Sequence, residues 1–223
     1  MVPDRDSRQG LCYGVGAYLL WGLFPLYWPL LRPAGALEIV AHRIIWSVLL
    51  VAVLLMLSRG WRGVAALVSH RATLGRLALA AALVSVNWCV YIWGVNHGHV
   101  VETSLGYFIN PLLTILLGVL VLHERLRSAQ WVAVAIASLA IVVLTVDYGQ
   151  LPWIALTLAT SFAGYGFLKK QVSAGASETL AVETAVLAGP ALITLFVLAD
   201  RSQLTFGHHG VGNALLLVCT GAV

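Results

Sequence analysis

The fold is decided by residues 36–57, which read ALEIVAHRIIWSVLLVAVLLML. As a helix rising 1.5 Å per residue, this run is about 33 Å long, enough to cross the roughly 30 Å hydrocarbon core of a bilayer. Its ionisable side chains, Glu38, His42 and Arg43, all lie in its first half. The run therefore predicts a membrane-spanning helix that carries polar groups toward one end.

Similar apolar runs fill the rest of the chain. Of its 223 residues 60% are hydrophobic and 10% are charged, far fewer charges than in soluble domains. The predicted spans are 10–31, 36–57, 74–95, 100–122, 130–146, 151–168, 179–199 and 212–223. We therefore expect an all-α polytopic membrane protein, in contact with the lipid bilayer. The basic residues behind the net charge of +4 lie in short joints between the runs, which excludes a nucleic-acid partner.

The distribution of Lys and Arg predicts the orientation, because positive residues are retained on the cytoplasmic side. With the N-terminus inside, the outer joints hold only Arg32 and Arg201, and Arg43 lies within a span. The cytoplasmic segments then hold Arg5, Arg8, Arg59, Arg62, Arg71, Arg76, Arg125, Arg127, Lys169 and Lys170. We predict a multi-pass protein of the inner (plasma) membrane with a cytoplasmic N-terminus.

A weak internal repeat relates the two parts of the chain. A shift of about 142 residues places Trp21 and Gly22 on Ala163 and Gly164, and a similar shift places His42 on Glu183. Residues 10–147 would form a first repeat of five spans, and residues 150–223 the start of a second. Because five is odd, the second copy enters the membrane inverted, as in many secondary transporters. The last run ends without a polar flank, so we expect ten helices in a longer protein.

Ionisable groups inside a membrane are costly and require a partner or a function. The candidates for a gate or an intramembrane ion pair are Glu38, His42, Arg43, Glu102 and Glu183. Arg43 has two interpretations. In the structural one it pairs with a carboxylate or extends to the membrane interface, and in the functional one it is part of an outer gate or contacts an anion. Glu183, near the inner end of its span, is its counterpart in the repeat and has the same two interpretations.

Polar stripes mark the third and fourth spans. Asn87 and Tyr91 lie four residues apart, and one face of the fourth span carries Ser104, Tyr107, Pro111, Thr114 and Gly118. These stripes predict either close helix packing or the lining of a cavity. Four tryptophans near span ends are expected to anchor the chain at the headgroups. They are Trp28, Trp61, Trp131 and Trp153.

Ligand-type residues cluster in one outer joint, at His97, His99 and Glu102. They lack a fourth ligand and an HExxH pattern, so we expect no metal site. The chain also lacks a phosphate-binding glycine loop and a catalytic constellation, which predicts no cofactor and no enzyme. An intramembrane enzyme built on these three residues stays open as an alternative.

Several strings of residues resemble those of a known family. They are 41–47 (AHRIIWS), 87–99 (NWCVYIWGVNHGH), 102–112 (ETSLGYFINPL) and 123–126 (HERL), together with Glu183 and Thr184. The chain resembles the RarD group of EamA-domain permeases in the drug/metabolite transporter superfamily. This resemblance implies a ten-helix, inverted-repeat inner-membrane permease. It also implies the pathway residues, which are Trp21, Asn87, Tyr91, Tyr107 and Asn110.

These observations together favour a secondary transporter for a small organic solute or drug-like metabolite, working by alternating access between two inverted repeats. A non-transporting membrane scaffold is the main alternative, and it is favoured if neighbouring helices fill the predicted pathway. A homodimer is compatible with the sequence.

Overall fold

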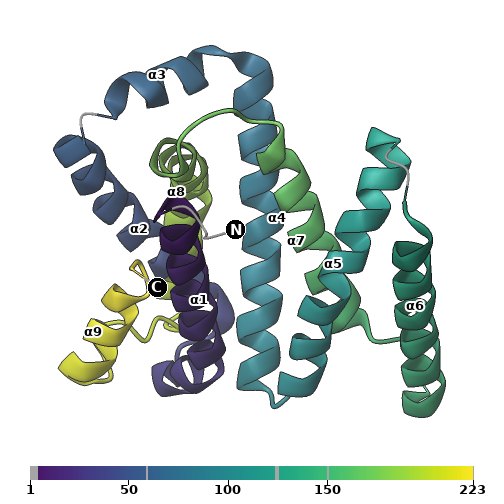
Figure 1. Cartoon of the computed structure of the whole chain (residues 1–223). Coiled ribbons are helices and arrows are strands. Elements are labelled where there is room, and N and C mark those ends of the chain that lie inside the picture. The colour runs from purple at the N-terminus through teal and green to yellow at the C-terminus, as the bar shows by residue number, and fades with distance from the viewer. Residues whose placement is uncertain (1–4, 59, 124–125, 150, 223) are drawn as a thin grey trace.

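The computed structural model describes residues 5–58, 60–123, 126–149 and 151–222, and the elements within them are helices (Figure 1). No strand occurs in these ranges. In chain order the helices are α1 (Arg5–Tyr27), the 3-10 helix η1 (Trp28–Leu31), α2 (Ala36–Ser58), α3 (Trp61–Ser69), α4 (Arg71–Asn96), α5 (Val100–Leu122), α6 (Ser128–Tyr148), α7 (Trp153–Lys170), α8 (Ala176–Asp200) and α9 (Gly210–Cys219).

Each predicted span overlaps a helix, although α9 ends at Cys219, before the end of the predicted span 212–223, and the all-α polytopic fold class is confirmed. Among the described residues, five stretches are long and apolar enough by themselves to cross a membrane, namely α1 with η1, α2, α4, α5 and α8. The apolar parts of α6 and α9 are shorter. Helix α7 has 18 residues, ends in Lys169 and Lys170, and buries Leu158 and Ala159 among its neighbours. Its apolar face therefore serves helix packing.

Helix α3 was not predicted from the sequence, because residues 58–73 were expected to form only an inner joint. Its nine residues are too few to span a bilayer. Leu67 is buried against Leu77 and Val182, whereas Arg62 on the same helix is exposed. This amphipathic pattern lays α3 across one end of the bundle (Figure 1).

The most extensive packing joins α5 with α7, α2 with α8, and α4 with α7. Small residues allow the first of these contacts. A Cβ added to Gly106 would lie 2.8 Å from the Cβ of Leu158 and 2.9 Å from the carbonyl oxygen of Ala155. The largest buried cluster joins η1, α2, α4, α8 and α9, and includes Trp28, Leu31, Ile39, Ile92 and Leu217. The fixed core is thus built from both predicted repeats.

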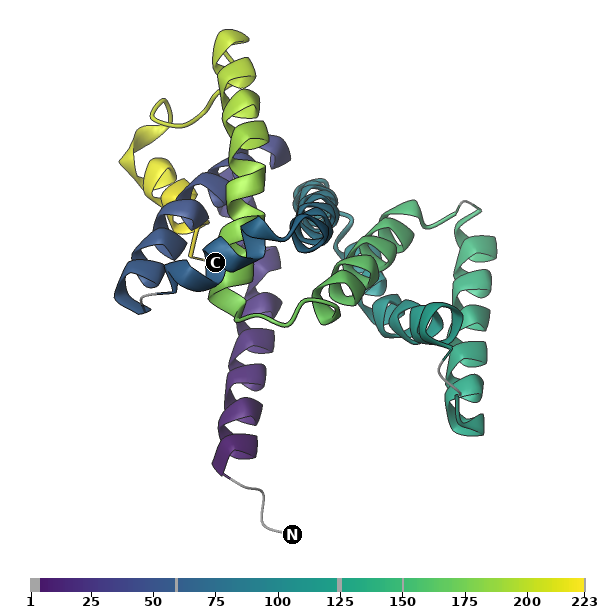
Figure 2. The same cartoon turned by 90° about the horizontal axis from the view of Figure 1, so that it is seen from above.

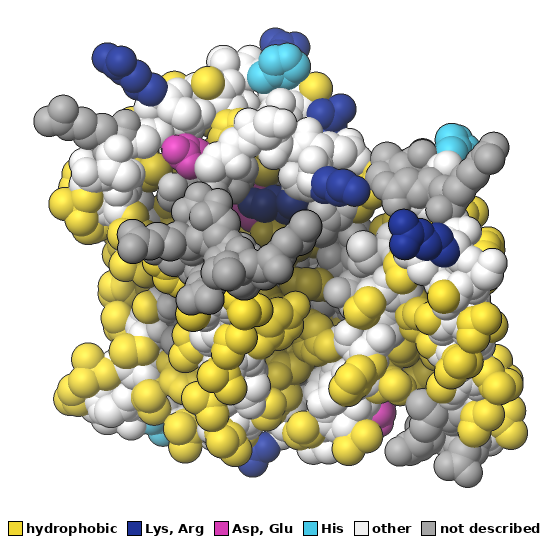
Figure 3. Space-filling model, in the orientation of Figure 1, with side chains coloured by type: hydrophobic (Ala, Val, Ile, Leu, Met, Phe, Trp, Pro, Cys, Tyr) yellow, Lys and Arg dark blue, Asp and Glu magenta, His cyan; other side chains and the backbone are white. Residues whose placement is uncertain are grey.

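Helices α1 and α6 lie toward the outside. Figure 2 shows α6 at one edge and α1 projecting from the assembly. Leu19 and Leu23 of α1 and Ile136 and Leu139 of α6 are more than half exposed. Figure 3 shows hydrophobic side chains covering the middle of the molecule. Such a surface is stable in lipid rather than in water.

Joints gather at two opposite ends of the bundle. At one end, Gly63 of α3 packs against Glu178 at the start of α8. At the other, Arg32 donates to the carbonyl oxygen of Asn96, and Trp93 contacts Trp153. Helix α7 therefore runs opposite to α1, and α8 runs opposite to α2. Figure 3 shows dark blue Lys and Arg side chains concentrated at the α3 end.

Some residues named in the predictions lie outside the described ranges. They are Arg59, Glu124 and Arg125, the side chains of Arg5 and Arg8, and Gln150 and Val223, which bound the predicted second repeat.

Candidate functional site

A chain of aromatic rings joins four helices. Trp21 of α1 meets Phe162 of α7 with ring centroids 6.4 Å apart, and Phe162 meets Tyr107 of α5 at 6.0 Å. Tyr107 in turn meets Tyr91 of α4 at 5.5 Å, edge to face. Such pairs favour these edge-on arrangements. Three predicted pathway residues, Trp21, Tyr91 and Tyr107, are thereby brought together, with Phe162 as the link that the sequence did not indicate.

Asn87 has a different environment, because its side chain is enclosed by helices. It is 0% exposed, and its amide nitrogen donates to the carbonyl oxygen of Leu158 at 2.9 Å and to Oγ of Ser161 at 3.0 Å. The Tyr107 hydroxyl donates to Oδ1 of Asn87 at 3.3 Å. A polar side chain inside a membrane protein is stabilised by such bonds. Asn87 therefore ties α4, α5 and α7 together.

The remaining pathway candidates differ in exposure. Trp21 is 46% exposed, on the side of α1 that also carries Tyr18. Asn110 is partly buried, and its Oδ1 is buried without a hydrogen-bond partner in the described part of the chain. A buried acceptor of this kind is costly unless water or a ligand satisfies it.

Only part of the polar stripe of α5 packs against other helices, because Tyr107 contacts α4 and α7 and Gly118 is buried. Ser104 and Thr114 are exposed and donate to carbonyl oxygens of their own helix, those of Val100 and Asn110. The buried positions of α5 include Thr103, Gly106 and Ile109. Periodicity alone did not identify this face because both faces contain small or polar residues.

Arg43 lies among aromatic rings. Its guanidinium carbon is 4.3 Å from the ring centroid of Trp88, 5.7 Å from that of Trp28 and 5.9 Å from that of Phe24. Trp28 is only 1% exposed, so its expected role as a headgroup anchor is wrong. The 3-10 turn after α1 directs this ring inward, whereas Trp61, Trp131 and Trp153 are exposed.

Glu38 and His42 fix a loop at the same end of α2. Oε1 of Glu38 accepts hydrogen bonds from the backbone N–H of Thr205 at 2.8 Å, from the Thr205 hydroxyl at 3.0 Å and from the N–H of Phe206 at 3.0 Å. The His42 ring lies 4.6 Å from the ring of Phe206. These two residues therefore hold the segment between α8 and α9.

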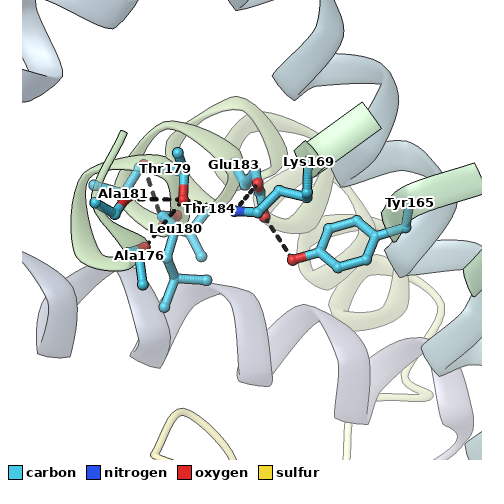
Figure 4. A network of polar contacts seen from close by, with 9 residues as sticks. Tyr165, Lys169, Ala176, Thr179, Leu180, Ala181, Glu183 and Thr184 are labelled. Atoms are coloured by element: carbon cyan, nitrogen blue, oxygen red, sulfur yellow. Dashed lines mark hydrogen bonds and ion pairs between the residues drawn. The ribbon is translucent and has the colours of Figure 1, made fainter. Parts of the chain in front are cut away.

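Glu183 belongs to a polar network between α7 and α8, shown in Figure 4. Nζ of Lys169 lies 2.7 Å from Oε1 of Glu183 and donates to Oγ1 of Thr179 at 2.6 Å. The Tyr165 hydroxyl reaches Oε2 of Glu183 at 3.4 Å. The Glu183 side chain is 3% exposed and that of Lys169 is 25% exposed. Glu183 is thus a member of an ion pair at the end where α3 lies.

Glu102 pairs with a histidine at the opposite end. Its Oε1 lies 2.8 Å from Nδ1 of His99, while Nδ1 of His97 lies 2.8 Å from the carbonyl oxygen of Trp93. Both imidazole rings stack on Trp93. Within the described ranges, no group of three or more His, Cys, Asp or Glu side chains could hold a metal ion.

An apolar cavity of about 340 Å³ lies between α2, α3 and α8. Its lining includes Val51, Leu55, Trp61, Val64 and Val182. The predicted pathway residues are not part of it.

The sequence did not indicate which side chains contact Glu183 and Arg43, above all Lys169, Tyr165 and Trp88. Lys169 was counted only for topology. Its spacing of four residues from Tyr165 places both on one face of α7, a signal that could have joined them to Glu183.

Three relatives resemble the chain over nearly its whole length. "Protein RarD" of Streptomyces exfoliatus is 55% identical over 223 residues, which are all of this chain and 71% of that protein. "Uncharacterized transporter YojE" of Bacillus subtilis (strain 168) is 44% identical, covering 99% of this chain and 74% of its own. "Protein RarD" of Salmonella typhi is 43% identical, covering 100% and 76%.

No solved structure matches this chain. The model of the EamA-like transporter family matches residues 8–146, which include the surroundings of Arg43 and the rings of Trp21, Tyr91 and Tyr107, but not Phe162. With apolar helices that can span a membrane and relatives named as transporters, the chain is a membrane permease of the RarD type and belongs to the EamA-like transporter family.

Proposed function

We propose that the protein is a secondary transporter that moves a small organic solute across the inner membrane by alternating access, with its N-terminus in the cytoplasm. Helix α7 begins at the end of the bundle where α1 ends, and α8 begins at the end where α2 ends, as expected for two inverted repeats. The aromatic chain lies where α1, α4 and α5 meet α7. This meeting of oppositely directed helices at an aromatic surface is the observation on which the proposal depends.

Polar contacts at each end support a gate at each end. At the α3 end, Lys169 and Glu183 join α7 to α8. At the opposite end, Glu38 joins α2 to the loop before α9, and Asn213 of α9 donates to the carbonyl oxygen of Leu31. Ion pairs and hydrogen bonds that exchange partners are a common basis of switching between two arrangements.

The geometry favours transport over enzyme chemistry. His97 and His99 stack on Trp93, and His99 is paired with Glu102, so the three residues proposed for an intramembrane enzyme are engaged at the helix end. The enclosure of Asn87 favours a second candidate, a non-transporting scaffold, because part of the expected pathway is filled by helix contacts.

Uptake by the full-length protein in proteoliposomes separates these candidates. The solutes are radiolabelled amino acids, organic acids, sugars and nucleosides, each measured with and without an imposed proton gradient. We expect at least one solute to accumulate above the level in protein-free liposomes. Absence of uptake for every class, with folded and inserted protein, would favour the scaffold.

The proposed orientation is tested separately by labelling single cysteines in a background without Cys12, Cys89 and Cys219. An impermeant maleimide should reach Ser69→Cys and Ser173→Cys from the cytoplasmic side only, and Ser202→Cys from the opposite side only. Labelling of Ser69→Cys and Ser202→Cys from one side would contradict the topology.

A further inference from the structure

Arg43 has no carboxylate partner within the described parts of the chain. The two ion pairs there are His99 with Glu102 and Lys169 with Glu183. Glu38, the acidic residue nearest to Arg43 in sequence, uses Oε1 to bind Thr205 and Phe206. Arg43 thus enters the membrane as an uncompensated cation, which is expensive unless it serves a function.

The surroundings of Arg43 hold its charge without using its hydrogen bonds. Trp88, Trp28 and Phe24 place ring faces within 6 Å of the guanidinium carbon, which favours the charged form by cation–π attraction. Across the described ranges the guanidinium donates no hydrogen bond. A guanidinium has five N–H donors in a planar fork that matches a carboxylate. The donors are therefore available to a ligand.

One unpaired polar atom lies on a ring that contacts Arg43, and two more lie on the same helix as Arg43. Nε1 of Trp28 is buried without a hydrogen-bond partner in the described structure, although Trp28 is 1% exposed. Nε2 of His42, on the residue before Arg43, is likewise buried and unpaired, and so is Nε1 of Trp46. Buried polar atoms without partners are uncommon in native proteins, and each calls for an explanation such as a bound water or ion.

Arg43 also adjoins the proposed pathway. Trp88, whose ring centroid lies 4.3 Å from the Arg43 guanidinium carbon, follows Asn87 on α4, and the Asn87 side chain accepts a hydrogen bond from the Tyr107 hydroxyl. Tyr107 belongs to the aromatic chain, so neighbouring residues of α4 join that chain to the surroundings of Arg43. Arg43 itself is only partly buried, so part of its surface stays accessible.

We infer that Arg43 binds the carboxylate of an organic solute, while Trp88, Trp28 and Phe24 contact the apolar body next to that carboxylate. This inference rests on the proposed transport function and names its substrate class. A carboxylate offers two oxygens to the fork and neutralises the charge inside the membrane. The ring faces suit an aromatic or branched apolar body, because they provide large rigid contact areas.

Matched ligands test the inference without any mutation. Calorimetric titration of the purified full-length protein at pH 8 compares benzoate with benzamide, which has the same shape and no charge, and with phenyl phosphate. We expect saturable binding of benzoate and binding of benzamide weaker by at least about tenfold. Equal binding of benzoate and benzamide, binding of phenyl phosphate alone, or no binding of any of the three would overturn it.

Variants then locate the site. Arg43→Gln should weaken benzoate binding by at least about 30-fold, the effect of removing one partner of a desolvated charge pair. Arg43→Lys, which keeps the charge but not the fork, should fall between Arg43→Gln and the unaltered protein. Arg201→Gln, at an exposed cation, is the matched control and should leave binding unchanged. Benzoate binding that survives in folded Arg43→Gln contradicts the assignment.

The uptake panel separates failure of this inference from failure of the transport proposal. Uptake of neutral solutes that is unaffected by Arg43→Gln would leave the transporter standing and remove the anion site. Benzoate binding that depends on Arg43, without uptake of any solute, would leave the anion site standing and contradict the transport proposal. If Arg43→Gln does not fold, Arg43→Lys and the benzoate–benzamide comparison still decide.

Discussion

Two charged residues at related positions of the predicted repeats are stabilised in different ways. Glu183 on α8 has a cation 2.7 Å away, a hydroxyl on its second oxygen and little exposed surface. Arg43 on α2 has aromatic rings and no carboxylate among the described residues. The first arrangement is complete, whereas the second leaves hydrogen-bonding capacity unused. The difference indicates that one position holds helices together and the other is available to a ligand.

The largest expected effect comes from breaking the complete pair. Lys169→Met leaves the Glu183 carboxylate buried without its cation, and should lower the free energy of unfolding by about 3 to 5 kcal/mol. Denaturant unfolding in detergent measures this loss. Adding Glu183→Gln should recover much of it, and Arg71→Met, at an exposed cation, is the control. A loss below about 1 kcal/mol would mean that the Lys169–Glu183 pair contributes no more than a solvent-exposed ion pair does.

Glu38→Leu tests whether Arg43 truly lacks a carboxylate. The change removes the acceptor of two backbone N–H groups and should destabilise the protein by about 2 to 3 kcal/mol. Hydrogen exchange should accelerate at the Thr205 and Phe206 amides. Combined with Arg43→Gln, the two losses should add within about 0.5 kcal/mol. Strong coupling between Glu38 and Arg43 would show that they form an ion pair. Arg43 would then not differ from Glu183 in lacking a partner.

Arg43→Gln alone should change stability by no more than about 1 kcal/mol in either direction. The lost cation–π attraction is offset by no longer burying a charge. Thermal unfolding of the purified variant checks this. A loss as large as that of Lys169→Met would reveal a structural partner and assign both positions the same role.

The smallest effect is expected at the hydroxyl beside Glu183. Tyr165→Phe removes a donor at 3.4 Å, a long and weak hydrogen bond, and should cost about 0.5 kcal/mol. The same denaturant titration detects it when it is run alongside Thr160→Val, which removes an exposed hydroxyl of α7. A loss near 2 kcal/mol would show that Tyr165 is as important to Glu183 as Lys169 is.

Hydropathy predicted the positions of the helices closely, and α5 runs from Val100 to Leu122 as expected. It missed α3, because a short amphipathic helix has no long apolar run. It also placed Trp28 at the lipid surface, since a tryptophan near a span end is usually an anchor. The 3-10 helix that begins at Trp28 and continues through Pro29 is what directs Trp28 into the core.

For the site, the sequence identified which side chains are unusual in a membrane but not what they contact. Asn87 and Tyr107 were identified as pathway residues, and the structure places them in a hydrogen bond between helices. Glu38 and Arg43 lie close together in the sequence, yet Glu38 binds a loop 167 residues further on. Such contacts are fixed by how helices pack, which no local pattern encodes.

The sequence by itself determined the apolar spans, the distribution of positive charge and the residues that are costly in lipid. These depend on transfer from water and on segment length, which are properties of each stretch alone. Tertiary structure decided that Glu183 meets Lys169 and that Arg43 meets Trp88. A buried charge takes whatever partner the neighbouring helices bring within reach, so only the packed bundle distinguishes a structural ion pair from a free binding group.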